Sequence, residues 1–444
     1  MQLFTDEIVK AMNGRSDGTR RPIHGVTTDT RSLRKGDLFF ALRGPKFDGH
    51  RFIPDAISKN ASYVVSEEPT AFPGRTILVE DTLYALGELA RYYRSKLKLR
   101  IVAITGSNGK TTTKDMTAAM LSSKAPTHKS PASYNNLIGV PLTILQLEPR
   151  HKFAVVELGM NRRGEIAREC DIIRPDLGVL TNIAPAHIGF FGSLSEIAEA
   201  KAELLTHLDH DKIALLNGDD SRVIGLSGST RAKVIMFSIR NRSEYRATGV
   251  KYLKDRLRFR VKETTFEMEA LGIENIYNAL AAIGVGDISG ISFDSMRDIL
   301  KDFRLPHLRG TVQRNGGVTV INDSYNSNPS SLKAALRWLK LLEGKRKIAV
   351  LGDMLELGIH GKKYHLQAGR MARDHCDLLV GVGDLARYFC EGMGTRNAHH
   401  FSTREEALRF LKELVTPGDV LLVKGSRLMK MEKIADALLA FVSA

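Results

Sequence analysis

The sequence predicts an α/β protein of three domains, and two features of the chain carry that prediction. A β-branched run, a glycine-rich turn and a helical pattern follow one another within residues 101–116, in the order typical of a phosphate-binding parallel sheet. Alternating strands and helices then return after about residue 305. Because 444 residues exceed what one hydrophobic core usually supports, we expect domains over residues 1–97, 98–304 and 305–444.

Composition argues against several classes of protein. Three widely separated cysteines without Cys-x-x-Cys spacing argue against a zinc site or a disulfide framework. The first residues include acids and no unbroken apolar core, which argues against a signal peptide or a membrane anchor. No later apolar run approaches the roughly 20 residues that a membrane span needs. We therefore expect a cytoplasmic protein with no membrane span. The formal net charge of +15 is interleaved with acidic residues and forms no arginine-rich tract. We therefore expect no nucleic-acid partner.

The first domain is expected to be a small α/β unit. The pattern predicts a helix over residues 5–12, a strand over residues 38–42 and a closing helix over residues 83–97. Polar clusters lie beside its strands, and by pattern alone each is more typical of a turn than of a site. These clusters are Asp29, Thr30 and Arg31, followed by Asp48, Gly49 and His50.

The glycine-rich turn after residues 101–105 is the strongest functional signal. In such a loop, backbone N–H groups cradle phosphate oxygens, a lysine adds charge and a hydroxyl is placed for Mg²⁺. Ile104 stands where the longer pattern needs glycine, so the match is to Gly-x-x-Gly-Lys-Thr. An ordinary turn with a solvated lysine is the alternative. The predicted phosphate-binding residues are Gly106, Ser107, Asn108, Gly109, Lys110, Thr111 and Thr112.

Later strands of the central domain end in polar residues. Glu157 closes an apolar strand, and a carboxylate at a strand's carboxyl end faces the ligand crevice, where it can take Mg²⁺. A surface glutamate is the alternative. A polar turn places Asn135 and Asn136 before this strand, and the next strand opens into a loop that carries Asn182 and His187. A loop histidine alone is weak evidence for a site.

Lys201 interrupts an apolar helical stripe. Burial would lower its pKa and favour a neutral, nucleophilic amine. The alternative is a buried stem with the ammonium in water, and the pattern alone slightly favours it. The stripe consists of Ile197, Leu204, Leu205 and Leu208.

Two asparagines share one face of a later helix. Asn275 and Asn278 are expected on an exposed face, opposite the apolar residues Ile276, Leu280 and Ile283. Side-chain amides in that position could read a purine edge or simply fill the surface.

The last third of the chain is expected to form a second parallel sheet. Its strands end at Asp353, at Asp384 and at the run Lys424 to Ser426, and no Gly-x-Gly-x-x-Gly motif supports dinucleotide binding. Functional groups should therefore gather at the strand ends.

Together these motifs resemble the Mur ligases, ATP-dependent enzymes that form amide bonds in bacterial cell-wall synthesis. The resemblance extends over nearly the whole chain, and its C-terminal part is similar to the branch that adds D-alanyl-D-alanine. The motifs that carry it are DTRSLRKGDLFFAL, DGHRFI, TGSNGKTTTK, NNLIGVPLTIL, ELGM, NIAPAHIGFFGS, EAKAEL, IYNALAA, NDSYNSNP, LGDMLELG and VKGSRLMKME.

The resemblance implies a UDP-sugar-binding first domain, a central P-loop ATPase domain and a Rossmann-like third domain. It implies ATP and Mg²⁺ as cofactors, UDP-N-acetylmuramoyl-tripeptide and D-alanyl-D-alanine as substrates, and an acyl-phosphate intermediate. We expect the chain to act as a monomer. The catalytic residues it implies are Lys110, Glu157, His187 and Lys201, with Thr111, Glu157, His187 and a carbamylated Lys201 at the metal.

The resemblance also implies contacts to the ligands. Asn278 would touch adenine and Asp323 the ribose. Arg309 would contact the nucleotide, although Arg309-Gly310 reverses the Gly-Arg order common in chains with these motifs. The implied substrate contacts are Thr30, Arg31, Asp48, Gly49, His50, Asn135, Asn136, Tyr325, Asn326, Asn328, Lys424 and Ser426.

Two other classes of function stay open at this point. One is a related ATP-dependent ligase, such as the tripeptide synthetase or a folylpolyglutamate-type enzyme. The other is a nucleotide-binding module without catalysis, or a P-loop ATPase acting on nucleic acid.

Overall fold

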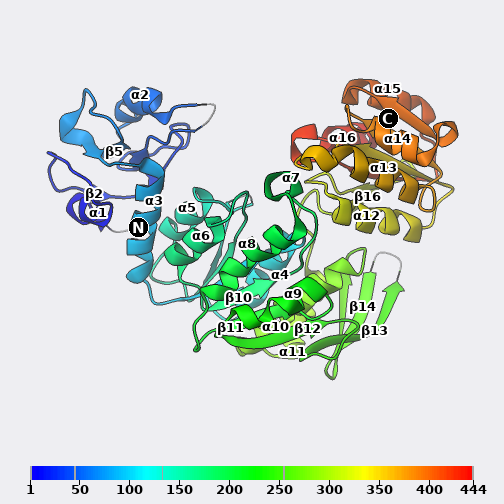
Figure 1. Cartoon of the computed structure of the whole chain (residues 1–444), viewed down its shortest axis with the longest axis horizontal. Coiled ribbons are helices and arrows are strands. Elements are labelled where there is room, and N and C mark those ends of the chain that lie inside the picture. The colour runs from blue at the N-terminus through cyan, green and yellow to red at the C-terminus, as the bar shows by residue number, and fades with distance from the viewer. Residues whose placement is uncertain (1–2, 45–46, 133, 254–255, 443–444) are drawn as a thin grey trace.

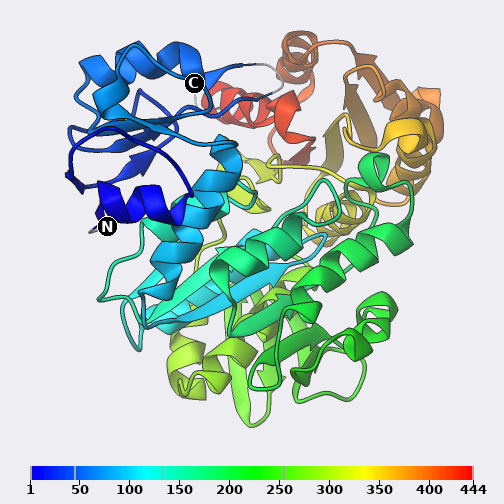
Figure 2. The ribbon, with the colours of Figure 1, turned by 60° about the vertical axis from the view of Figure 1, so that its left-hand side comes forward.

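The computed structural model describes residues 3–44, 47–132, 134–253 and 256–442. The chain forms an N-terminal, a central and a C-terminal part, each with its own sheet (Figure 1). Both views place the N-terminal and C-terminal parts on the same side of the central part (Figures 1 and 2). Within the described ranges, no helix is both long and apolar enough to cross a membrane.

The N-terminal part is a parallel sheet flanked by helices. Its strands follow the order β3-β4-β5-β6, and a small antiparallel pair, β1 and β2, lies beside them. Helix α3 leads into the central part, where the Tyr93 hydroxyl donates to the Leu147 carbonyl at 2.7 Å. The elements are β1 (Leu3–Phe4), α1 (Thr5–Ala11), β2 (Pro22–Ile23), β3 (Val26–Thr27), β4 (Leu38–Phe40), α2 (Ile53–Ser58), β5 (Tyr63–Ser66), β6 (Thr76–Leu78) and α3 (Thr82–Ser95).

The central sheet has the order β15-β14-β13-β12-β11-β10-β7-β9-β8. Alternate residues of β7 face opposite sides: Ile101 packs with the core beneath α5, α6 and α8, and Val102 with the core beneath α4 and α10. The strands are β7 (Arg100–Thr105), β8 (Thr127–Lys129), β9 (Phe153–Glu157), β10 (Leu177–Leu180), β11 (Ile213–Asn217), β12 (Lys233–Ser238), β13 (Tyr245–Leu253), β14 (Arg256–Val261) and β15 (Thr264–Glu269).

Helices cover both faces of this sheet (Figure 2). Helix α10 packs against α4 on one face, and α6 packs against α8 on the other. The helices are α4 (Lys110–Ser122), α5 (Gly139–Leu145), α6 (Glu165–Ile173), α7 (Ile188–Phe191), α8 (Leu194–Thr206), α9 (Ser221–Gly225), α10 (Glu274–Ile288) and α11 (Phe293–Asp302).

The central sheet is parallel from β13 through to β8 and carries an antiparallel extension at one edge. Strands β13, β14 and β15 pair antiparallel. Only two residues, Lys262 and Glu263, separate β14 from β15, and a connection that short can join antiparallel strands but not parallel ones.

The C-terminal sheet has the order β16-β17-β21-β18-β19-β20, with β16 antiparallel to β17. This edge departs from the expected parallel arrangement, because Gly316 and Gly317 form a two-residue hairpin turn at φ of +53° and +74°. The elements are β16 (Thr311–Asn315), β17 (Val318–Asn322), α12 (Pro329–Leu341), β18 (Arg346–Gly352), α13 (Gly361–Ala372), β19 (Leu378–Val382), α14 (Arg387–Met393), β20 (Ala398–Phe401), α15 (Arg404–Leu414), β21 (Asp419–Lys424) and α16 (Glu432–Phe441).

Candidate active site

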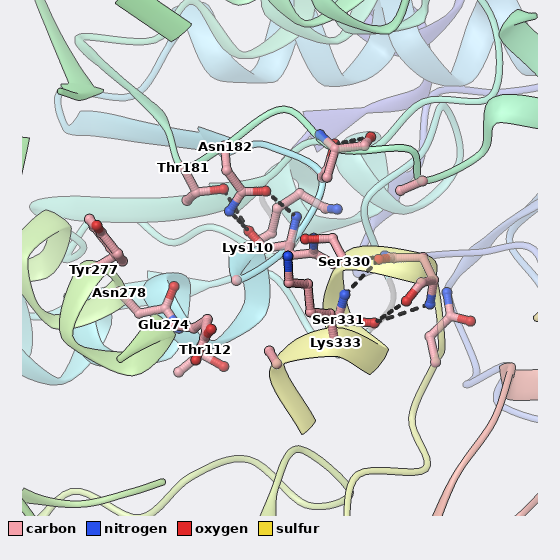
Figure 3. A pocket seen from close by; sticks show the side chains of 18 of the residues that line it. Lys110, Thr112, Thr181, Asn182, Glu274, Tyr277, Asn278, Ser330, Ser331 and Lys333 are labelled. Atoms are coloured by element: carbon pink, nitrogen blue, oxygen red, sulfur yellow. Dashed lines mark hydrogen bonds between the residues drawn. The ribbon is translucent and has the colours of Figure 1, made fainter. Parts of the chain in front are cut away.

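A cavity of about 650 Å³ lies between the central and C-terminal parts. The loop before α4 forms one wall, the first turns of α12 face it, and α10 contributes a third side (Figure 3). Strands β9, β10, β17 and β21 end at this cavity, as expected for ligand sites of parallel sheets.

The glycine-rich turn has the shape of a phosphate-binding loop. Gly109 precedes α4 at φ +82°, and a Cβ there would collide with Oδ1 of Asn278. Lys110 begins the helix, is half-buried and donates from Nζ to the Gly106 carbonyl at 2.9 Å. Burial lowers the pKa of Lys110. The alternative of an ordinary turn with a solvated lysine is therefore wrong in its placement of the lysine.

Glu157 sits at the bottom of the cavity and is only 3% exposed, so the alternative of a surface glutamate is wrong. Its Oε2 accepts from the Thr111 hydroxyl at 2.7 Å, and its Oε1 accepts from Nδ2 of Asn135 at 2.8 Å. Nζ of Lys114 lies 4.0 Å from the same carboxylate. Asn135, Thr111 and Glu157 are thus brought together, whereas Asn136 does not line the cavity.

These oxygen atoms suit a hard cation. Among the described residues, no three His, Cys, Asp or Glu side chains form a ready-made metal cluster. A hydroxyl and a carboxylate 2.7 Å apart at the foot of a phosphate-binding loop nevertheless match the donors that Mg²⁺ prefers. The residues present therefore fit Mg²⁺.

Lys201 of α8 is buried, with 3% of its surface exposed. The alternative in which its ammonium reaches water is therefore wrong. Burial lowers the pKa of Lys201 well below the ordinary lysine value, and the nearby charge of Lys110 lowers it further. Glu169 of α6 is fully buried, and its two carboxylate oxygens make no hydrogen bond to any described residue. Burial raises the pKa of Glu169 well above the usual range.

His187 contacts a residue that the sequence analysis missed. Its Nδ1 is buried and lies 2.8 Å from Oε2 of Glu356, which follows β18 in the C-terminal part. The contact with His187 lowers the pKa of Glu356. The LGDMLELG run was recognised as a motif, but no local pattern distinguishes Glu356 from a surface carboxylate.

Arg309 reaches the phosphate-binding loop despite its reversed order with Gly310. Its Nη2 donates to the Thr111 hydroxyl at 2.8 Å, and its guanidinium lies 3.8 Å from the centre of the Tyr325 ring. Asn328 makes a second contact between the two parts, from its Nδ2 to Oδ1 of Asn108 at 2.7 Å.

A buried ion pair lies beside these contacts. Lys424 Nζ is 2.5 Å from Oδ2 of Asp323 and donates to the Asn326 carbonyl at 2.9 Å. Burial raises the pKa of Asp323, and Lys424 opposes that rise. All three residues line the cavity.

The two asparagines of α10 are not on an exposed face, so that expectation is wrong. Asn275 and Asn278 are 5% and 7% exposed. Nδ2 of Asn275 donates to the Leu271 carbonyl at 2.7 Å, and Oδ1 of Asn278 accepts from the Thr113 hydroxyl at 3.2 Å. Helix α10 packs against α4 and against strands of the sheet, and both asparagines line the cavity from its first turns.

Other predicted site residues do not themselves line this cavity. In the N-terminal part, Arg31 pairs with Asp29 at 2.7 Å, and Asp48 accepts from the backbone N–H of His50 at 3.0 Å. Ser426 instead accepts from the Leu355 backbone N–H at 2.8 Å. The predicted residues that do not line the cavity are Gly106, Thr30, Arg31, Asp48, Gly49, His50, Asn136, Lys201 and Ser426.

The sequence analysis also missed cavity residues on α12. Lys333 and Arg337 are exposed one turn apart and line the cavity. Ser330 and Ser331 lie at the start of the same helix, near Lys333 (Figure 3). Their helical spacing is visible in the sequence, but nothing local indicates that this face meets the phosphate-binding loop.

Three segments of the chain match domains of one enzyme family. Residues 22–94 match the Mur ligase family catalytic domain, residues 104–286 the Mur ligase middle domain, and residues 309–427 the Mur ligase glutamate ligase domain.

Full-length relatives give the same picture. The UDP-N-acetylmuramoyl-tripeptide–D-alanyl-D-alanine ligase of Bacillus subtilis (strain 168) is 35% identical and aligns with 98% of this chain and 97% of its own. The enzyme of that name from Escherichia coli (strain K12) is 35% identical, with 97% of each chain covered.

Solved structures extend the likeness to the fold. A crystal structure of MurF from Acinetobacter baumannii superposes with a TM-score of 0.93 at 30% identity, covering 99% of both chains. MurF ligase from Thermotoga maritima in complex with ADP gives a TM-score of 0.86 at 27% identity, covering 94% of this chain and 98% of that one. The predicted fold class, three α/β domains, is confirmed by these likenesses.

Proposed function

Because this chain belongs to the Mur ligase family, we propose that it joins D-alanyl-D-alanine to UDP-N-acetylmuramoyl-tripeptide with consumption of ATP. The product is the UDP-N-acetylmuramoyl-pentapeptide precursor of peptidoglycan. Full-length relatives of that name in two bacteria support the assignment. The structural observation that supports this function most strongly is the hydrogen bond from Arg309 to Thr111, which joins the third domain to the phosphate-binding loop.

The proposed reaction has two steps. The carboxylate that ends the tripeptide attacks the γ-phosphate of ATP to give an acyl phosphate and ADP. The amine of D-alanyl-D-alanine then attacks the acyl carbon, and phosphate leaves from a tetrahedral intermediate. Because a carboxylate must approach a polyphosphate, the first step needs positive charge more than it needs a general base.

The residues around the cavity supply that charge. Lys110 and Arg309 both line the cavity, and Arg309 donates to the Thr111 hydroxyl next to Lys110, so the two cations can neutralise the phosphates. Thr111 and Glu157, with His187 and a carbamylated Lys201, would hold Mg²⁺. When bound there, Mg²⁺ neutralises charge on the phosphoryl group.

We also propose a division of labour among residues 1–97, 98–304 and 305–444. The first would hold the UDP-sugar through Thr30, Arg31 and the loop from Asp48 to His50. The second would hold ATP, with Asn278 near adenine. The third would hold the dipeptide through residues of the buried ion pair and its neighbours, namely Tyr325, Asn326, Asn328, Lys424 and Ser426, with Asp323 near the ribose. A cytoplasmic monomer would suffice for this arrangement.

A substrate panel tests the proposed function. The purified chain is incubated with ATP, Mg²⁺ and UDP-muramoyl peptides, with and without D-alanyl-D-alanine, and both phosphate and product mass are followed. Phosphate release that needs both the tripeptide and the dipeptide, with a pentapeptide product, supports the proposal. Ligation of a different amino acid or of glutamate to a folate would identify a sibling ligase. Release stimulated only by DNA or RNA would refute ligation.

A further inference from the structure

His187 and Glu356 meet where the central and C-terminal parts touch. His187 precedes α7, and Glu356 lies in the loop after β18. Oε2 of Glu356 is 2.8 Å from Nδ1 of His187, although the two are not aligned as a standard hydrogen bond. Nδ1 itself is buried, whereas the side chains remain 26% and 42% exposed for His187 and Glu356. The carboxylate therefore covers one particular ring nitrogen.

The backbone around this contact is held in an uncommon shape. His187 and Glu356 both have positive φ, at +60° and +67°, a region that non-glycine residues rarely enter. The Gly189 N–H donates to the Glu356 carbonyl at 2.9 Å. Gly189 also faces Gly358 so closely that a side chain on either would meet backbone atoms of the other segment. Backbone conformations of this kind cost energy and persist only where surrounding contacts hold them in place, and they are often found at functional sites.

The contact with Glu356 can decide which ring nitrogen of His187 carries the proton. A neutral histidine carries one proton, and the nitrogen that bears it is fixed by the hydrogen bond it makes. If Nδ1–H points at Glu356, then Nε2 keeps its lone pair. Histidines that ligate metals usually donate their other ring N–H to a carboxylate, a backbone carbonyl or water, which fixes the tautomer and the orientation of the ring. His187 lines the cavity beside Lys110, so the lone pair would be available to a ligand there.

We propose that Glu356 is a positioning residue that fixes the tautomer and ring orientation of His187, so that docking of the C-terminal domain prepares His187 for the metal. The proposal rests on the proposed function, which places His187 beside Mg²⁺. Because the carboxylate and the imidazole belong to different domains, the site is complete only when the domains are together. A purely structural ion pair would hold the domains without selecting a tautomer.

Selective ¹⁵N labelling of histidine tests this in the ligand-free protein. Long-range ¹H–¹⁵N correlations distinguish the two tautomers, and the signal of His187 is identified by its loss in His187→Asn. We expect the Nδ1-protonated form in the parent protein. Glu356→Asn should shift His187 toward the Nε2-protonated form, because asparagine tolerates positive φ but is too short to reach the ring. Glu343→Gln, at an exposed glutamate of the same domain, should change nothing.

A binding measurement gives a second readout. Mn²⁺ affinity in the presence of the β,γ-methylene analogue of ATP should fall about 10- to 100-fold in Glu356→Asn. In a His187→Asn background the same change should have no further effect. An Nε2-protonated His187 in the parent protein would overturn the inference even if the variant failed to fold. So would an unchanged tautomer in Glu356→Asn.

The two proposals fail separately. Pentapeptide formation with a tautomer that does not depend on Glu356 refutes the positioning role alone. A tautomer governed by Glu356 in a protein that forms no pentapeptide refutes the proposed function alone.

Discussion

Nη2 of Arg309 donates a hydrogen bond to the Thr111 hydroxyl at 2.8 Å, between residues 198 positions apart in the chain. The same hydroxyl donates to Glu157 at 2.7 Å. A single threonine thus joins the carboxylate of the central sheet to the cation of the third domain. All three groups line the cavity.

Arg309→Lys should reduce kcat/KM for ATP by about 10- to 100-fold, the range expected for losing a hydrogen bond from a charged group. A lysine ammonium cannot both lie flat on Tyr325 and reach Thr111 as a planar guanidinium does. The effect is measured as kcat/KM in steady-state assays in which the ATP concentration is varied. Arg304→Lys, at an exposed ion pair with Glu269, is the matched control and should behave like the parent. Equal loss in both variants would mean that Arg309 has no particular role.

Lys110→Ala should keep its fold and lose ligation by on the order of 100- to 1000-fold or more. Within the described part of the chain, the side chain makes one hydrogen bond, to the Gly106 carbonyl, so removing the side chain costs little stability. Removing its charge leaves the phosphates uncompensated. Circular dichroism and pentapeptide formation are measured together, with Lys98→Ala on the exposed linker as the control. Normal turnover by folded Lys110→Ala would contradict the phosphate-binding assignment.

Lys201→Ala should be inactive but partly restored by short carboxylic acids. A buried lysine with a lowered pKa offers a neutral amine to CO₂, and the resulting carbamate has two oxygens that an added acid can replace. Lys201→Arg should stay inactive with or without acids, because a guanidinium remains charged.

The carbamate on Lys201 can be detected directly by mass spectrometry. Active parent protein kept in bicarbonate, with labile adducts trapped, should show the added mass of a carbamate on the peptide containing Lys201. Full activity of Lys201→Arg, or an unmodified lysine in active protein, would refute the carbamate.

The stability of the protein should fall as the pH drops from about 6.5 to about 4, because of His365. This side chain is fully buried, its Nε2 accepts from the Met354 N–H at 3.0 Å, and burial lowers its pKa from 6.5 to about 4. Between these two pH values the imidazole binds a proton in the unfolded chain but stays neutral in the folded chain. The free energy of unfolding is therefore highest above pH 6.5 and decreases by on the order of 3 kcal/mol as the pH falls to about 4.

Urea unfolding between pH 4 and pH 7 measures this dependence. His365→Gln removes the titrating group and should flatten the curve over that range, at some cost in stability at neutral pH. Equally steep curves for the parent and His365→Gln would assign the pH dependence to other groups.

The sequence predicted those parts of the site that local patterns encode. The strand, glycines, lysine and threonine around Lys110 are contiguous, and Glu157 directly follows its strand, so adjacency alone placed both at the cavity. The family resemblance and the α/β fold class are confirmed for the same reason, since many short motifs keep their order along the chain.

What the sequence did not predict depends on contacts between distant segments. Whether Lys201 reaches water is decided by α6 packing over α8, and the apolar stripe fits either outcome. Asn278 lay on the polar side of its own helix, yet α4 covers that side. The role proposed for Glu356 depends on its contact with His187, which lies in another domain. Pairwise packing of this kind leaves no periodic signal in one sequence.

The fate of one oxygen atom tests the proposed acyl-phosphate chemistry most directly. Both oxygens of the terminal carboxylate of UDP-N-acetylmuramoyl-tripeptide are labelled with ¹⁸O, the tripeptide is ligated to D-alanyl-D-alanine with unlabelled ATP, and the mass of the released phosphate is measured. We expect each phosphate to carry one ¹⁸O, because the carboxylate oxygen that attacks the γ-phosphate leaves with it. Pentapeptide formed with unlabelled phosphate would contradict the account.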